Sequence, residues 1–306
     1  ETKKGNPQNH PSVSLFRDYL RLRTVHPEPD YDAALRFLDR IAEELDLPIK
    51  KIEVCPGRVV SIMTWEGTKP SLKSVLLNSH TDVVPVYQEH WKYDAFSAFK
   101  DAEGNIYGRG SQDMKCVTIQ YIEAVRRLKA EGWKPTRTLH LMYVPDEEVG
   151  GHKGMETFVL HPEFRNLNIG FSLDEGLANP GEAFTVFYGE RNPWSGEDVT
   201  YDFAQKHMNQ NITSTEESDP WWSAFTAACK SLNMTLEKEI FPAATDSRFI
   251  RAVGIPAIGF SPMNRTPILL HDHNEYLNER VFLRGISVYE RLIPALTSVS
   301  ALPGEA

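Results

Sequence analysis

The stretch that most limits what this chain can fold into is residues 139–151, with the sequence LHLMYVPDEEVGG. Its apolar run is typical of a strand inside a sheet, and the proline and the glycine pair that follow would end that strand. The strand therefore presents Glu147 and Glu148 at its exit. Because successive side chains of an extended backbone point to opposite sides, we expect these two glutamates to have different roles. Acidic pairs in turns are usually only solvated, so a functional role depends on ligand-type residues at other strand ends.

Strand-like and helix-like segments alternate along the chain. Helical spacing of apolar residues predicts helices over 12–25, 30–47, 116–132, 154–160, 219–232 and 281–296. Apolar runs bounded by proline or glycine predict strands over 49–54, 59–65, 74–78, 139–144, 169–173, 184–188 and 255–260. The alternation indicates an α/β fold, a mostly parallel mixed sheet with helices on both faces. Ligand sites of such folds lie beyond the carboxyl ends of the strands.

The composition supports a large folded chain and argues against some partners. With 306 residues and 41% hydrophobic content, the chain can build a substantial core. Its formal charge of −9 argues against a general nucleic-acid or anionic-membrane binder. No signal-peptide core and no apolar stretch of about 20 residues is found, so we expect a cytoplasmic protein without membrane contact. Three widely spaced cysteines, Cys55, Cys116 and Cys229, predict reduced thiols.

Residues of the kind that bind metals follow two more of the predicted strands. His80 and Asp82 come after the third strand and are separated by one residue, so both side chains point to the same side. A carboxylate in that position can accept the second N–H of an imidazole and fix its tautomer. Glu175, preceded by Asp174, follows the fifth predicted strand in the same way.

Two further segments complete a ligand set. Asp113 lies in a glycine-rich loop that enters a helix, and a later segment reads HDH. With His80, Glu148 and Glu175, they give two imidazoles and three carboxylates. Such mixed ligation suits two zinc ions bridged by one carboxylate, since metals about 3.5–4 Å apart are typical of two-metal hydrolases. Glu147 is then left over as a general base.

Five ordered segments resemble a known family: HTDVVP, GRGSQDMKC, PDEEVGG, LDEG and LLHDHNE. They resemble the zinc-dependent metallopeptidase family that includes carboxypeptidase G, succinyl-diaminopimelate desuccinylase and aminoacylases. The similarity to aminoacylases extends along nearly the whole chain, through WKYDAFSAF, ERNPW, FPAATDSRF and GFSPMNRTP. The resemblance implies that His80, Asp113 and Glu148 hold one zinc, and that Asp113 bridges to a second zinc held by Glu175 and His271.

The same resemblance implies two catalytic roles: Asp82 orients the first histidine, and Glu147 activates the water between the metals. His271 is preferred over His273 because the family pattern places a glutamate, here Glu275, four residues after the ligand. Asp174 remains a rival to the neighbouring Glu175. In the segment AATDSR, which has fewer glycines than the family form, Thr245 and Arg248 are candidate substrate contacts.

The implied function is zinc-dependent hydrolysis of N-acyl-L-amino acids to a carboxylate and a free L-amino acid. Zinc would activate water, and Glu147 would take its proton and return it to the leaving nitrogen. A dipeptidase or carboxypeptidase of the same family is the alternative enzyme. The alternative outside catalysis is a zinc-binding domain that keeps the ligands but lacks transition-state contacts.

A segment that the family carries is missing here. Family members have a lid domain inserted after a segment like ERNPW, whereas here Trp194 is followed by SGED and then by VTYDFAQKHM, which resembles the sequence after the lid. We therefore expect a catalytic domain in two parts, 1–194 and 199–306, joined by a linker at 195–198. In the family the lid carries the dimer contact, a substrate-binding arginine and a histidine that completes the neighbouring active site. Full-length relatives are expected to be homodimers and this chain a weakly active monomer.

Overall fold

The computed structural model describes residues 10–191, 195–197, 200–202 and 211–305. At its centre is an eight-stranded sheet in the order β1-β2-β6-β3-β7-β12-β8-β11. The pairs β3–β6, β3–β7, β7–β12 and β8–β11 are parallel, and the other three are antiparallel. The strands are β1 (Ile49–Cys55), β2 (Arg58–Trp65), β3 (Ser74–His80), β6 (Leu139–Val144), β7 (Ile169–Asp174), β8 (Phe184–Glu190), β11 (Leu236–Phe241) and β12 (Ala257–Phe260).

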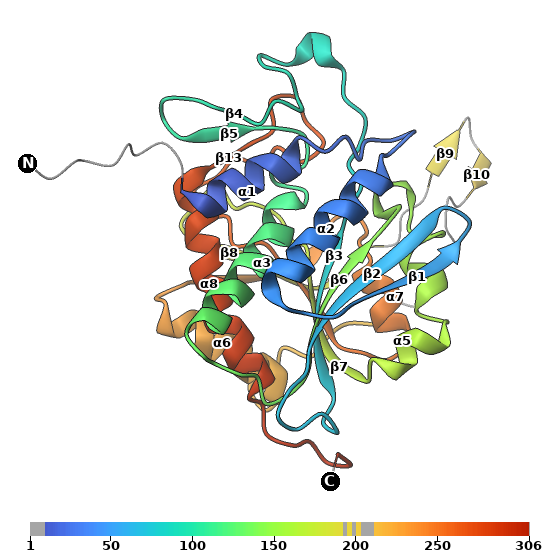
Figure 1. Ribbon diagram of the computed structural model, residues 1–306, viewed down its shortest axis with the longest axis vertical. Helices are drawn as coiled ribbons and strands as arrows, with labels where there is room; N and C mark the ends of the chain where they lie inside the picture. The colour runs from blue at the N-terminus through green and yellow to red at the C-terminus, as the bar shows by residue number, and fades with distance from the viewer. Residues whose placement is uncertain (1–9, 192–194, 198–199, 203–210, 306) are drawn as a thin grey trace, which may run out of the picture.

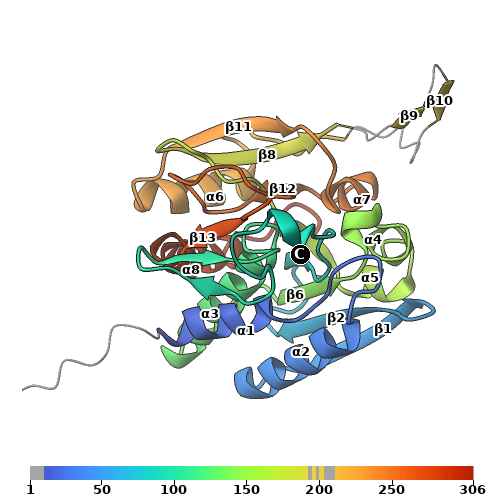
Figure 2. The ribbon, with the colours of Figure 1, turned by 90° about the horizontal axis from the view of Figure 1, so that it is seen from above.

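Helices cover both faces of this sheet, which confirms the predicted α/β class (Figures 1 and 2). One layer holds α1 (Pro11–Leu20), α2 (Tyr31–Leu45), α3 (Lys115–Ala130), α6 (Pro220–Ser231) and α8 (Glu279–Thr297). The other layer holds the shorter α4 (Met155–Phe158), α5 (Pro162–Asn166) and α7 (Ser247–Ala252). None of the helices in the described part of the chain is long and apolar enough to cross a membrane.

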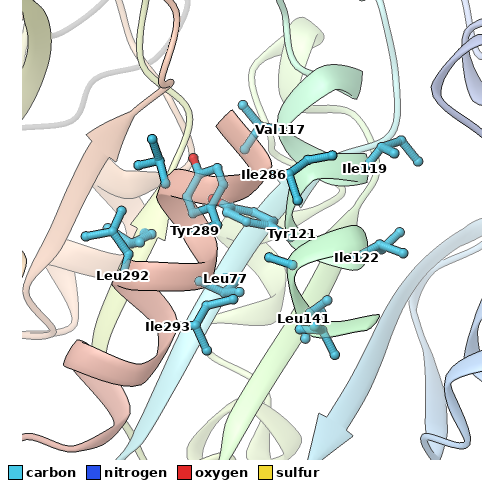
Figure 3. Packing of buried hydrophobic residues seen from close by; sticks show 14 of the residues in the cluster. Leu77, Val117, Ile119, Tyr121, Ile122, Leu141, Ile286, Tyr289, Leu292 and Ile293 are labelled. Atoms are coloured by element: carbon cyan, nitrogen blue, oxygen red, sulfur yellow. The ribbon is translucent and has the colours of Figure 1, made fainter. Parts of the chain in front are cut away.

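The alternation of side chains along the central strands produces two separate cores. In β3, Val75 and Leu77 pack with α3 and α8, while Leu76 between them packs with α4 and α7. In β6, Leu141 joins the first core and Met142 the second. Figure 3 shows the first core, where isoleucines and tyrosines of α3 and α8 meet the strands. Because both faces are buried, these strands read as continuous apolar runs in the sequence.

Helix caps set several boundaries. The Asp30 side chain accepts a hydrogen bond from Ala33 N at 2.9 Å at the start of α2, and Asp219 caps α6 in the same way, both as predicted. The first helix, in contrast, ends at Leu20 and not near residue 25. The reason is that Val25 forms a parallel bridge with Val83, so this stretch is extended beside the exit of β3.

A second sheet has three strands, β4 (Phe99–Lys100), β5 (Asn105–Tyr107) and β13 (Tyr276–Asn278), in the order β13-β5-β4. Leu277 pairs with Ile106, so the segment that carries the HDH sequence is fixed next to the glycine-rich loop. Two 3-10 turns, η1 (Gln88–His90) and η2 (Glu147–Val149), complete the description. All three cysteines are free, as predicted.

Part of the predicted linker, Ser195–Glu197, forms β9 and pairs antiparallel with β10 (Thr200–Asp202). The remaining linker residue and the flanking residues 192–194, 199 and 203–210 lie outside the described part. Strands from before and after this point share the central sheet, since β11 and β12 pair with β8 and β7. The two parts of the sequence therefore build one sheet.

Candidate metal centre

The order β6-β3-β7 of parallel strands brings three chemically important exits together. His80 is the last residue of β3, Glu175 follows β7 directly, and Glu147 and Glu148 form the turn after β6. Asp113 reaches the same place from the loop before α3. The carboxyl ends of adjacent parallel strands form a crevice, where α/β folds place their ligand sites.

The two carboxylate oxygens of Asp113 face two different imidazoles. Oδ1 lies 3.0 Å from His80 Nε2, and Oδ2 lies 3.0 Å from His271 Nε2. The next carboxylate beside His80 Nε2 is Glu175 at 3.4 Å, with Glu147 at 3.7 Å, and the next beside His271 Nε2 is Glu148 at 2.9 Å. The arrangement provides two donor groups that share one aspartate.

These groups differ from the pairing that the family resemblance implied. The donor atoms of His80, Asp113 and Glu175 lie within 4.8 Å of one another, as do those of Asp113, Glu148 and His271. The expected set of His80, Asp113 and Glu148 is not among the groups that the described residues form. Both β6 and β7 pair with β3, so the side-chain contacts decide the groups: Glu175 lies 3.4 Å from His80 Nε2, whereas Glu148 lies 2.9 Å from His271 Nε2. A third group joins His80 with Glu147 and Glu148.

The tautomer of His80 follows from its second nitrogen. Nδ1 lies 2.9 Å from the backbone carbonyl oxygen of Asp82, which can only accept, so Nδ1 carries the hydrogen. In the neutral ring, the lone pair on Nε2 then faces the carboxylates. The Asp82 carboxylate itself is farther from Nδ1, at 3.5 Å, so the expected contact of Asp82 with His80 is made chiefly by the main chain.

Glu275 has a structural role that sequence analysis missed. There, Glu275 served only to choose His271 over His273. The Glu275 carboxylate is fully buried and accepts hydrogen bonds from the backbone N–H groups of Gly110 at 3.1 Å, Gln112 at 2.6 Å and Asp113 at 3.3 Å. It also pairs with the buried Arg109 guanidinium at 3.0 Å. Glu275 therefore fixes the loop that presents Asp113.

Asp174 and His273, the alternatives to two of the predicted ligands, contact other residues. Asp174 accepts hydrogen bonds from Asn78 at 3.2 Å and Ser247 at 3.0 Å, and it is in none of the donor groups of the described residues. The ring of His273 lies 4.8 Å from the ring of His90, also outside those groups. The geometry favours Glu175 and His271.

The site concentrates negative charge in a buried place. Burial and the neighbouring Asp113 raise the pKa of Glu148 to about 7, and burial and Glu175 raise the pKa of Glu147 well above its usual range. Hydrogen bonds to Asp113 and Glu148 raise the pKa of His271 to about 11. Desolvation and neighbouring carboxylates thus disfavour the charged glutamates, while contact with carboxylates favours the charged imidazole, so the site holds more buried carboxylates than positive charge.

That excess fits a site for divalent cations. Buried charges are stable only when paired or bound to a metal, and one buried oxygen, Glu148 Oε1, has no hydrogen-bond partner among the described residues. The donors are imidazole nitrogens and carboxylate oxygens, the mixture that zinc accepts. The residues present therefore fit two zinc ions that share Asp113.

A cavity of about 400 Å³ opens beside these residues. Arg248 lies in its wall, and its buried Nε and Nη1 have no hydrogen-bond partner in the described part of the chain. Thr245, the other predicted substrate contact, is not in the wall, and its hydroxyl donates to Glu190 at 2.6 Å. Sequence reasoning missed the apolar wall because it used only the polar residues of the segments PDEEVGG, FPAATDSRF and LLHDHNE. The wall comprises Val149, Phe241, Ala243, Ala244 and Leu270.

A sheet of this type with clustered imidazoles and carboxylates at its strand exits defines a metallohydrolase. Residues 76–295 match the model of "Peptidase family M20/M25/M40", and the chain belongs to that family. Aminoacylase-1B of Rattus norvegicus is 49% identical and human aminoacylase-1 is 48% identical. Both alignments cover 100% of each chain and run over 407 residues. The resemblance to aminoacylases is thereby confirmed.

Solved structures share the fold at low sequence identity. Human carnosine dipeptidase 1 has a TM-score of 0.76 at 11% identity and covers 94% of this chain and 96% of its own. A dinuclear metal-binding peptidase of the M20 family from Bacillus subtilis has a TM-score of 0.64 at 13% identity, covering 95% and 99%.

Proposed function

We propose that this chain is a two-zinc amidohydrolase that cleaves N-acyl-L-amino acids into a carboxylate and a free L-amino acid in the cytoplasm. The observation that carries the proposal is the position of Asp113 between His80 and His271, each with its own additional carboxylate. The substrate class is supported by relatives that are named aminoacylase-1 and match the chain from end to end.

Each residue then has one task. His80, Asp113 and Glu175 would hold one zinc, and Asp113 would share the second zinc with Glu148 and His271. Zinc in such a site lowers the pKa of water toward neutrality and polarises a carbonyl oxygen.

The general base would be Glu147, which belongs to neither of the two donor groups that share Asp113. Its carboxylate lies in the cavity wall, and one oxygen is 3.7 Å from His80 Nε2. Burial raises its pKa, which suits a group that first takes a proton from water and then gives it to the leaving nitrogen. Arg248 lies in the same wall, and its Nε and Nη1 have no acceptor among the residues that the structure describes, so it is the proposed contact for the carboxylate of the amino acid.

The test separates ligand from base with two adjacent residues. Purified wild type, Glu147→Gln and Glu148→Gln are compared for zinc per chain and for release of methionine from N-acetylmethionine. Glu148→Gln should lose zinc, whereas Glu147→Gln should keep it and lose hydrolysis by a factor of 10² or more, roughly the size of a general-base contribution. Zinc loss in both variants to the same extent would show that the roles are assigned wrongly. A wild type that binds zinc but cleaves neither N-acetylmethionine nor a dipeptide would be a binding domain.

We also propose that the lid domain of the family is absent and replaced by the linker at 195–198. The alignment with the aminoacylases runs over 407 residues, so at least 101 of its positions have no residue in this chain of 306. Without the lid, the chain would be a monomer with low turnover.

A further inference from the structure

His26 lies behind the metal centre, directly after the first helix predicted over 12–25. The backbone from Thr24 to His26 runs beside the exit of β3: Val83 N donates to Thr24 O at 2.9 Å, and His26 N donates to Val83 O at 3.1 Å. This pairing places the His26 side chain next to Asp82. The contact is close, with His26 Nε2 2.7 Å from Asp82 Oδ2.

The Asp82 carboxylate is fully buried and connects two strand exits. Its Oδ1 accepts the backbone N–H of Glu147 at 3.2 Å, and its Oδ2 accepts the backbone N–H of Glu148 at 3.0 Å. Both carboxylate oxygens therefore serve as acceptors, and His26 Nε2 is the donor to Oδ2.

We infer that His26 is a positioning residue for the turn that carries the base and a ligand. It fixes one oxygen of Asp82, and the two oxygens in turn fix the backbone from which the Glu147 and Glu148 side chains leave. His26 is not in the cavity wall, so it acts through Asp82 and not on the substrate. The inference rests on the proposed function for the roles of the two glutamates.

The same turn has a second support that does not depend on His26. Tyr31 donates its hydroxyl to Asp146 Oδ1 at 2.6 Å and accepts the Asp146 N–H at 2.9 Å. Arg58 Nε also donates to Asp146 Oδ2 at 2.7 Å. Because these contacts remain when His26 is changed, the turn should stay folded. The substitution should only displace the Glu147 and Glu148 side chains.

The experiment compares His26→Leu, His26→Gln and the control Thr24→Val. Leucine fills the space of the ring without a donor, while the glutamine amide nitrogen can occupy the place of Nε2. Thr24→Val removes a neighbouring hydrogen bond, from Thr24 Oγ1 to Thr81 O at 2.6 Å, that does not involve Asp82. For each variant we would measure the melting temperature, kcat and KM on N-acetylmethionine, and the zinc dissociation constant by competition with a chelator.

For His26→Leu we expect kcat to fall about 10-fold and the zinc dissociation constant to rise about 10-fold. This is the lower end of the range for residues that orient metal ligands without binding the metal, about 10- to 100-fold. KM should stay within about twofold, and His26→Gln should recover most of both losses, since it keeps the donor. Thr24→Val should leave kcat and zinc binding unchanged even where it lowers the melting temperature.

Wild-type kcat and zinc binding in His26→Leu would overturn the inference. So would equal losses in Thr24→Val, or a His26→Gln variant as impaired as His26→Leu, because either result indicates a general loss of stability. The zinc measurement needs no substrate. If wild type binds zinc but does not cleave N-acetylmethionine, the proposed function fails while the His26 inference is still decided by zinc affinity.

Discussion

Replacing Glu275 by glutamine tests whether one buried carboxylate supports the loop of Asp113. The substitution keeps the size of the side chain but replaces one acceptor oxygen by an NH₂ group. Whichever way the amide turns, its hydrogens face either the donors Arg109 and Gly110 or the donors Gln112 and Asp113. Two buried donors lose their acceptor in both cases.

The magnitude follows from these contacts. A buried donor without a partner costs about 1–3 kcal/mol, so two cost about 2–6 kcal/mol. Arg109 is also left without its carboxylate, and removing one member of a buried ion pair typically costs about 3–5 kcal/mol. Arg109 keeps hydrogen bonds to two carbonyl oxygens, of Asp272 at 2.9 Å and Pro85 at 3.3 Å, which limits its share. We expect a loss of about 3–5 kcal/mol in the free energy of unfolding, together with weaker zinc binding.

Urea unfolding of wild type and Glu275→Gln measures this loss, with Glu279→Gln as the matched control. Glu279 pairs with Lys100 at 2.8 Å near the surface, where the glutamate side chain is 28% exposed, so the control should lose no more than about 1 kcal/mol. A Glu275→Gln variant as stable as Glu279→Gln, with unchanged zinc binding, would refute the proposed support of the loop.

Three further predictions concern metal, acid and assembly. Dialysis against a chelator should lower the melting temperature and added zinc should restore it, because an ion that binds only the folded state stabilises it; no change would argue against a resident metal. The Arg137 guanidinium lowers the pKa of Glu305 from 4.5 to about 2, so this carboxylate stabilises the fold above about pH 4.5 and loses its effect as the pH falls toward 2. The unfolding free energy of wild type should therefore fall more steeply below pH 4.5 than that of Glu305→Gln, and parallel curves would contradict this. Sedimentation should give the mass of one chain. Turnover of N-acetylmethionine should be at least about 10² below that of rat aminoacylase-1B, since the lid histidine that completes the active site is expected to be absent and the loss of one donor to the transition state costs about that much. Equal turnover by a monomer would show that the lid is dispensable.

The sequence determined the elements whose signals are local. The helices with strong periodicity and a capping aspartate, α2 and α6, begin where predicted, because a cap is a contact within one turn of chain. The buried strands were visible as apolar runs, and the residues after them supplied His80, Glu147, Glu148 and Glu175 as candidates. Short α5 and α7, the edge strand β11 and the three-stranded sheet were missed, since their few residues show no period of their own.

Only the tertiary structure decided which of these residues are neighbours. The order β6-β3-β7 brings the three strand ends together, and the folded loop before β13 adds His271, so that Glu175 lies beside His80 and Glu148 beside His271. No pattern along the chain encodes these neighbours. His26 and Asp82 are 56 residues apart, and Glu275 and Gly110 are 165 residues apart. Contacts of this kind leave no local trace because each partner alone is an ordinary polar residue. The chain supplies the donor types, and the packing of its sheet decides what each donor touches.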